Sequence, residues 1–269
     1  MAPASDLPPL LDHALDLAQQ AGQRILAVYQ SDFAVTHKED ASPLTQADLA
    51  SHTLIVETLA RLAPRLPCLS EEAADIPYAT RRAWPRYWLV DPLDGTREFV
   101  KRNGEFTVNI ALVEDHRPVL GVIHAPVLGL TWGAARGAGA FRLDGAKRVS
   151  IATRRVGTPL TCVASRSHRT DDTDLYIRKF ATAEIVSVGS SLKFCMIAAG
   201  KADLYPRFGR IMEWDTAAGD AVLRAAGGIT LTLDGTPLTY GKRGTPGVDD
   251  FVNPPFIAKG RIEDLPLKI

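Results

Sequence analysis

Apolar residues near the N-terminus repeat with the period of a helix. Leucine, alanine, isoleucine and valine recur every three or four positions, which predicts an amphipathic helix over about residues 9–30. A second helix is predicted to begin after Thr45, because a threonine followed three residues later by Asp48 can form a capping box. Its apolar stripe continues to about Arg65, where we expect the helix to end.

Beyond the second helix the pattern changes to short runs of β-branched and aromatic residues, separated by glycine, proline or charged turns. The runs up to residue 143 predict a largely antiparallel α+β first half. From residue 160 onward strands alternate with helices, which indicates an α/β second half. We expect strands at 68–69, 87–90, 106–113, 119–125, 130–134, 140–143, 160–164, 185–188 and 202–205, and helices at 173–180, 190–199 and 215–226.

A polar and basic stretch at 148–158 separates these two differently patterned halves. It predicts two lobes, residues 1–150 and residues 151–269, in a protein that is α/β overall. Residues 253–256 contain two consecutive prolines, so we expect a loop there.

The composition is that of an ordinary globular enzyme, with 46% hydrophobic and 23% charged residues. Lys plus Arg and Asp plus Glu both total 31, so the chain has no overall field for a nucleic-acid polymer. Any phosphate-binding site must therefore be local. The three cysteines lie far apart without metal-binding spacing, which favours a reducing cytoplasm over a disulfide-forming compartment.

The sequence predicts neither secretion nor a membrane span. Residues 1–6 lack the basic and apolar regions of a signal peptide, and the most apolar stretch, 119–135, is interrupted by His124, Pro126 and Gly129. We therefore expect a cytoplasmic protein. The oligomeric state and a loose association with the inner face of a membrane are left open.

Carboxylates stand where predicted strands end. The apolar run 88–90 leads into Asp91, and Asp94 follows three residues later, just before a glycine and a threonine. Hard carboxylate oxygens suit Mg²⁺, although a plain Asp-Gly turn accounts for the same motif. Glu71 follows another short strand, and Asp215 stands at the first turn of a predicted helix, where simple N-capping accounts for it equally well.

Taken together, these segments resemble the lithium-sensitive inositol monophosphatase superfamily. The resemblance rests on Lys38 with Thr45-x-x-Asp48, on Ser70-Glu71-Glu72, on Asp91-Pro92-Leu93-Asp94-Gly95-Thr96 and on Glu213-Trp214-Asp215-x-Ala217-Ala218, in this order. It narrows to the bacterial 3′(2′),5′-bisphosphate nucleotidase branch through residues 97–99, 101–109, 165–168, 189–194 and 201–207. It covers nearly the whole chain.

The resemblance implies a layered αβαβα sandwich of the sugar-phosphatase type. It further implies hydrolysis of adenosine 3′,5′-bisphosphate to AMP and phosphate, a reaction linked to sulfur assimilation, together with inhibition by lithium. Two or three Mg²⁺ ions would be bound mainly by the first lobe. By analogy, one ion would be held by Glu71, Asp91 and the Leu93 carbonyl, and a second by Asp91, Asp94 and Asp215, with Glu71 also sharing a loosely held third ion.

The same resemblance assigns catalytic roles. Thr96, held by Asp48, would orient the attacking water and help to deprotonate it, and Glu71 would assist. Asp48 has an alternative role as the capping acid of its own helix. Lys38 would contact the site's water or the phosphate, although that residue taken alone is more simply a solvated loop cation.

The substrate would be held by residues from both lobes. Gly95, Thr96 and Asp215 would contact it near the metals. In the second lobe, Ser190, Lys193 and Arg207 would hold the 5′-phosphate that is not cleaved, and His168 would lie near the adenine. A lysine or arginine alone is more often a surface cation, so this assignment depends on the joint match to the nucleotidase branch.

Three alternatives stay open at this point. An inositol monophosphatase or a fructose 1,6-bisphosphatase could use the same metal site. An aspartyl-phosphate hydrolase would carry Asp-x-Asp, whereas two residues separate Asp91 from Asp94 here. A non-catalytic nucleotide-sensing protein would be expected to have lost a metal ligand, and all the acidic ligands are present.

Overall fold

The structure is a computed structural model that describes residues 6–37, 43–156, 158–180, 183–243, 249–263 and 265–267. Its larger sheet is seven-stranded, in the sequential order β3 to β9, and all neighbouring pairs are antiparallel except β3 and β4. The strands are β3 (Cys68–Ser70), β4 (Arg86–Asp94), β5 (Thr107–Glu114), β6 (Arg117–Ala125), β7 (Leu130–Ala135), β8 (Gly139–Asp144) and β9 (Lys147–Ile151).

The smaller sheet is five-stranded, and its order, β11-β10-β12-β14-β13, departs from the order of the chain. The strands are β10 (Thr161–Ser165), β11 (Glu184–Val188), β12 (Leu204–Arg207), β13 (Ile229–Thr232) and β14 (Phe256–Lys259). The main helices are α1 (Leu7–Tyr29), α2 (Gln46–Arg61), α5 (Asp171–Ile177), α6 (Leu192–Ala198) and α7 (Trp214–Ala225). Shorter elements are β1 (Val35–His37), β2 (Pro43–Thr45), the 3₁₀ helix η2 (Glu71–Ala73), α3 (Tyr78–Arg81) and α4 (Thr96–Val100).

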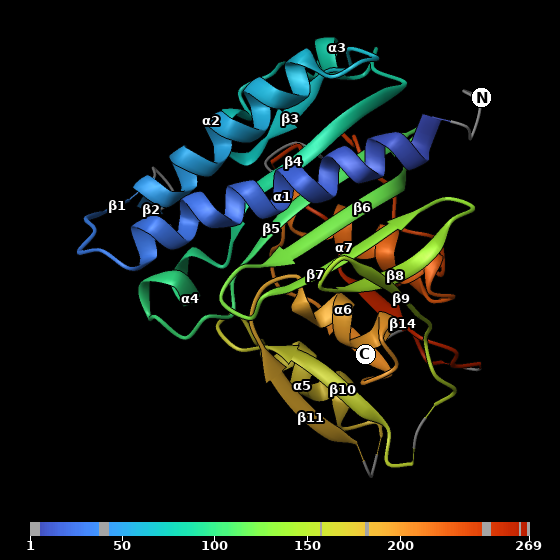
Figure 1. Cartoon of the computed structure of the whole chain (residues 1–269). Coiled ribbons are helices and arrows are strands. Elements are labelled where there is room, and N and C mark those ends of the chain that lie inside the picture. The colour runs from blue at the N-terminus through green and yellow to red at the C-terminus, as the bar shows by residue number, and fades with distance from the viewer. Residues whose placement is uncertain are drawn as a thin grey trace.

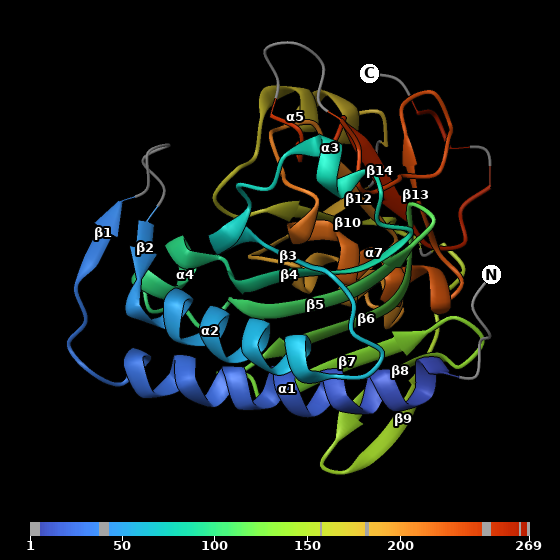
Figure 2. The ribbon, with the colours of Figure 1, turned by 90° about the horizontal axis from the view of Figure 1, so that it is seen from above.

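Helices and sheets alternate in layers (Figure 1). Helices α1 and α2 run side by side over the outer face of the larger sheet (Figure 2), and α6 and α7 lie between the two sheets. Helix α5 lies against β12 of the smaller sheet. This is the αβαβα sandwich that the resemblance implied.

Helices on both faces account for the continuous apolar runs of the larger sheet. Strand β4 is buried from Arg86 to Leu93, without the alternation of a half-exposed strand. Its Val90 packs in a core beneath α1 and α2, while Leu89 belongs to a second core that also contains Val222 of α7. Helix α7 therefore joins residues from both halves of the chain in one core.

Most predicted elements are present, and three expectations about the strands and the loops between them are corrected. The basic stretch near residue 148 is partly strand β9, the edge of the larger sheet. Strand β14 begins at Phe256, directly after the prolines, where a loop was expected. Strand β12 continues through Pro206 to Arg207 instead of ending before the proline. A division into two lobes near residue 150 stays a prediction.

Two helices are shorter than predicted because their flanking residues leave the helical region. Helix α2 ends at Arg61, since Leu62 is extended. Helix α6 begins at Leu192, because Ser190 adopts a left-handed φ of 50°. Among the described helices, none is both long and apolar enough to cross a membrane.

Candidate active site

The site begins at an irregularity in β4. Asp91 pairs with Asn109 of β5 and Asp94 pairs with Thr107, but the register shifts between these two pairs. On a regular strand, residues three apart face opposite sides of the sheet. The bulge changes that alternation, so both aspartates line one cavity.

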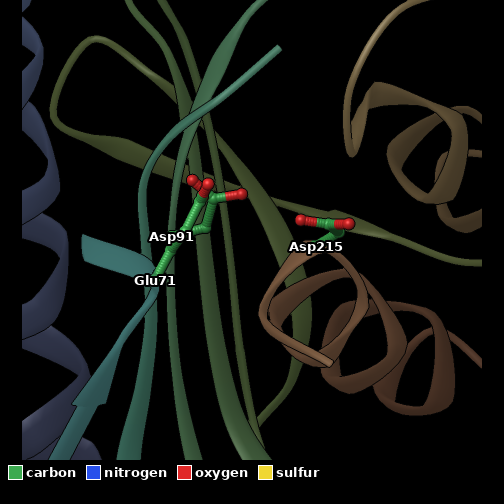
Figure 3. A group of neighbouring side chains, drawn as sticks. All are labelled: Glu71, Asp91 and Asp215. Atoms are coloured by element: carbon green, nitrogen blue, oxygen red, sulfur yellow. The ribbon is translucent and has the colours of Figure 1, made fainter. Parts of the chain in front are cut away.

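Two further elements bring carboxylates to the same place. Glu71 is the first residue of η2, directly after β3, which runs parallel to β4. Asp215 lies in the first turn of α7. Ligand oxygens of Glu71, Asp91 and Asp215 all lie within 4.8 Å of one another. Figure 3 shows the three side chains and the elements that carry them. Segments far apart in the sequence thus form one acidic cluster.

The environment of this cluster fits a cation. Asp91 is 1% exposed; its Oδ1 accepts a hydrogen bond from the Leu93 N–H (3.0 Å), whereas its buried Oδ2 has no partner among the described residues. Burial raises the pKa of Asp91 well above its ordinary value, and the neighbouring carboxylates add to the effect. Burial, with a contribution from Asp94, raises the pKa of Asp215 to about 6. Bound divalent ions would remove this repulsion, and oxygen-only donors suit Mg²⁺.

Asp94 lies beside the cluster rather than in its closest group. Its Oδ2 accepts hydrogen bonds from Ser191 Oγ (2.8 Å) and from Asn109 Nδ2 (3.3 Å). Ser191 Oγ also lies 2.8 Å from the Asp215 carbonyl, so one hydroxyl connects β4, α6 and α7. Sequence reasoning missed Ser191 and Asn109 as site residues, although both stand inside motifs that carried the resemblance.

Thr96 and Asp48 are in contact, as the resemblance implied. Thr96 Oγ1 lies 3.1 Å from Asp48 Oδ1 and 3.3 Å from the Leu93 carbonyl oxygen. Asp48 Oδ2 accepts two hydrogen bonds from Thr45 at the start of α2, one from its N–H and one from its hydroxyl. Gly95 has a φ of 93°, which turns the chain between Asp94 and Thr96 and favours glycine. The geometry thus supports both suggested roles of Asp48.

The second-half residues are brought to the same cavity. Lys193 is 5% exposed, and its Nζ donates to the Ser190 carbonyl (2.5 Å). Burial lowers the pKa of Lys193 to about 8, while the charge of Asp94 opposes that shift. Arg207 is equally buried, and its guanidinium donates to the carbonyls of residues 168, 209 and 210. Arg207 therefore holds the backbone at residues 168, 209 and 210 in place and also lines the cavity.

The cavity measures about 340 Å³. Its walls include every site residue predicted from the sequence except Asp48 and Lys38. Asp48 lies behind Thr96, and Lys38 falls outside the described residues. Further lining residues that the sequence did not single out are Arg97, Glu98, Ser165, Ser191, Arg210, Met212 and Trp214.

Comparison with known proteins identifies this arrangement. The family model described as "Inositol monophosphatase family" matches residues 6–258. The chain belongs to this family. Among solved structures it is similar to an IMPase from Thermotoga maritima, with a TM-score of 0.75 and 25% identity over 93% of this chain and 92% of that one.

Closer similarity is found to one branch of the family. The chain is 47% identical over 250 residues to the 3′(2′),5′-bisphosphate nucleotidase CysQ of Escherichia coli (strain K12), which covers 92% of this chain and 98% of that protein. The crystal structure of CysQ from Bacteroides thetaiotaomicron is similar, with a TM-score of 0.79 and 42% identity over 93% of this chain and 96% of that one.

Proposed function

We propose that this chain is a Mg²⁺-dependent 3′(2′),5′-bisphosphate nucleotidase, a phosphoric monoester hydrolase that converts adenosine 3′,5′-bisphosphate to AMP and phosphate. One observation carries the proposal: the walls of a single cavity contain both an acidic cluster and the buried cations Lys193 and Arg207. A substrate with two phosphates fits such a cavity, one phosphate reacting and the other being held. The similarity to curated nucleotidases supports the same substrate class.

The acidic cluster is the proposed metal centre. Glu71, Asp91 and the Leu93 carbonyl are assigned to one Mg²⁺, and Asp91, Asp94 and Asp215 to another, with a third ion shared by Glu71. When bound, such ions activate water and neutralise the charge that develops on the leaving ribose oxygen. The buried Oδ2 of Asp91, which has no hydrogen-bond partner in the part of the chain that the structure describes, supports the assignment of Asp91 as the ligand shared between the two ions.

Protein groups supply the orientation of the water. The Thr96 hydroxyl donates a hydrogen bond to Asp48 Oδ1. The lone pairs of Thr96 Oγ1 are then free to accept a proton from water. Asp48 is itself fixed by two hydrogen bonds from Thr45, so the Thr96 hydroxyl has a defined direction. No covalent phosphoenzyme is required, because water attacks phosphorus directly.

The far part of the cavity is assigned to the 5′-phosphate and the nucleoside. Ser190, Lys193 and Arg207 hold the 5′-phosphate, and His168 lies beside the adenine. Arg207 uses part of its hydrogen-bonding capacity on three backbone carbonyls, yet a guanidinium has five N–H groups, so donors remain for a phosphate. We further place the reaction in sulfur assimilation and the protein in the cytoplasm.

A panel of substrates tests this function. We expect phosphate release from adenosine 3′,5′-bisphosphate to exceed release from inositol monophosphate and fructose 1,6-bisphosphate by at least about tenfold, with none in excess chelator. Asp91→Asn should abolish turnover without unfolding the protein, because it removes one of several mutually repelling buried charges. Full activity in chelator, or a phosphoaspartate trapped at Asp91, would contradict the proposal.

A further inference from the structure

A buried arginine lies outside the residues that line the cavity. Arg81, at the end of α3, is 5% exposed. Its Nε donates to the Ile76 carbonyl (3.0 Å), and its terminal nitrogens donate to the Lys242 carbonyl (3.4 Å) and to the Asp250 carboxylate. The guanidinium also lies over the Phe251 ring, 4.3 Å from its centroid. Arg81 thus contacts its own segment on one side and Lys242, Asp250 and Phe251 on the other.

The segment that carries Arg81 begins at the acidic cluster. Glu71 opens η2, and the chain continues directly through Ile76 into α3. The Arg81 side chain donates a hydrogen bond to the Ile76 carbonyl, and this bond holds the end of α3 against the preceding segment. Ile76 also packs against the core that contains Trp214 of α7. The path from Glu71 to Arg81 is therefore short, and the Arg81 side chain holds its far end.

The partners of Arg81 are joined to the start of α7. The Glu213 N–H donates to the Phe251 carbonyl (2.8 Å), and the rings of Phe251 and Trp214 have centroids 5.1 Å apart. The Asn253 N–H donates to the Ile211 carbonyl (2.9 Å). Asp215 follows Trp214 directly, and its Oδ2 accepts the Met212 N–H (2.9 Å). Arg81 therefore links the segment after Glu71 to the segment around Asp215.

We infer that Arg81 is a positioning residue for the metal centre, which holds Glu71 at ligand distance from Asp215. The inference rests on the proposed metal-dependent function. The two carboxylates come from segments that β pairing does not connect directly, and they repel each other before a cation binds. A cation that bridges their supporting segments keeps them close, so less reorganisation accompanies metal binding.

A matched control is available in Arg86. It is also buried, with 10% of its side chain exposed, and it forms ion pairs with Asp6 and Glu114. It opens β4, five residues before Asp91, and therefore lies about 17 Å away along the strand. Replacing either arginine by methionine removes a buried cation from its ion pairs and should lower the thermal unfolding midpoint.

The experiment measures metal binding directly and without substrate. Binding of Mn²⁺, which accepts the same oxygen ligands, is followed by the loss of the electron paramagnetic resonance signal of the free ion. We expect Arg81→Met to weaken Mn²⁺ binding roughly tenfold and to raise the Mg²⁺ concentration for half-maximal hydrolysis by the same factor. At saturating Mg²⁺ its kcat should stay within about twofold of the wild type. Arg86→Met should leave Mn²⁺ binding unchanged.

The outcomes separate positioning from folding. Unchanged Mn²⁺ binding in Arg81→Met, or equal losses in the two arginine variants, would overturn the inference. Should Arg81→Met fail to fold, Phe251→Leu, which keeps the arginine but removes the ring between Arg81 and Trp214, is expected to weaken Mn²⁺ binding at least threefold, and normal binding there would overturn it equally. A wild-type protein that binds Mn²⁺ but does not hydrolyse the bisphosphate would refute the proposed function and leave this inference standing.

Discussion

Asp48 is the residue for which two roles were left open, and the structure gives one oxygen to each. Its Oδ2 caps α2 through Thr45, and its Oδ1 contacts Thr96 at the cavity. The sequence could not assign them because the first contact is local and the second depends on bringing together residues 48 positions apart. The two roles can therefore be separated by changing the partners rather than Asp48 itself.

Two substitutions separate them. Thr45→Ala removes the capping hydroxyl, so we expect the free energy of unfolding to fall by about 0.5–2 kcal/mol. Its backbone N–H still donates to Asp48 Oδ2, so kcat should stay within about twofold of the wild type. Thr96→Val removes the hydroxyl that orients the water, so kcat should fall by about 10²–10⁴ with little change in stability. Urea unfolding and phosphate release measure both effects. A similar loss of kcat in the two variants would show that the cap and the catalytic contact are one unit.

Another single residue, Lys193, allows a test of the substrate assignment. Lys193→Ala should raise KM for adenosine 3′,5′-bisphosphate by one to two orders of magnitude, about 1.5–3 kcal/mol for a lost charged hydrogen bond. Hydrolysis of a 3′-monophosphate without the 5′ group should change little. Lys201→Ala is the control, because Lys201 is exposed and does not line the cavity.

Arg207→Ala should raise KM for the bisphosphate similarly. It should also destabilise the fold, because three backbone carbonyls lose their donors. If Lys193→Ala and Arg207→Ala impair both substrates equally, the bisphosphate assignment is wrong.

At the level of single residues, the sequence singled out the acidic residues but not their supporting hydrogen bonds. Asp91 and Asp94 stood out because two carboxylates at the end of a strand offer the hard oxygen ligands that Mg²⁺ prefers. Ser191 and Asn109 did not, since serine and asparagine are common at the surface of most proteins. Their role depends on the register of β5 and on where α6 meets β4, neither of which a single sequence specifies.

Among the elements, α7 makes a very close contact with the larger sheet. A Cβ added at Gly121 of β6 would lie 2.4 Å from the Ala218 carbonyl oxygen and 2.7 Å from the Ala221 Cβ. The helix can approach the strand so closely only because residue 121 has no side chain. Because Asp215 lies in the first turn of the same helix, this approach also determines how close Asp215 lies to the sheet.

Gly121→Ala should therefore push α7 away. We expect a loss of about 1–3 kcal/mol of stability, together with weaker Mg²⁺ activation because Asp215 moves with the helix. Gly260→Ala is the control, since an added Cβ there would meet Thr153 Cβ at an ordinary 3.4 Å. Chemical denaturation and Mg²⁺ titration of the activity measure both quantities. Equal behaviour of the two variants would mean that β6 and α7 adjust to each other freely.

The elements that were mispredicted share a cause. Strand β14 is short and follows two prolines, yet it pairs on both sides with β12 and β13. Pro206 lies inside β12, beyond the single pair that β12 makes with β10, so its missing N–H interrupts little of that ladder. In each case a neighbouring strand, distant in sequence, determines the structure more than local propensity does.

For the whole molecule, the periodicity predicted the classes of the two halves but not their assembly. The order β11-β10-β12-β14-β13 cannot be read from periodicity, because hydrophobic patterning does not say which strands are neighbours. The layered arrangement came from the family resemblance. It places α7 between the sheets, and so puts Asp215 of the second half beside Asp91 of the first.

The burial of these acids predicts how the whole protein responds to pH. The pKa of Asp215 is raised from 3.8 to about 6, so between these values the folded metal-free protein binds a proton that the unfolded chain does not. Its free energy of unfolding should therefore fall as the pH rises through this range. Mg²⁺ replaces the proton, so the increase in melting temperature on adding Mg²⁺ should be large at pH 8 and small at pH 5. An increase that is the same at both pH values would contradict the electrostatic account.

The position of α7 between the sheets also has a consequence for protein synthesis. The strands of the larger sheet are complete once Ile151 has been made, but the helix that covers their inner face ends only at Ala225. At 5–20 residues per second, the ribosome needs about 4–15 s to make this intervening stretch. During that time the nascent chain exposes the apolar face that contains Leu89, Ala111 and Ile123. Chaperones that recognise exposed apolar strands would find their binding site on the growing chain there, and that site disappears when α7 folds onto the sheet.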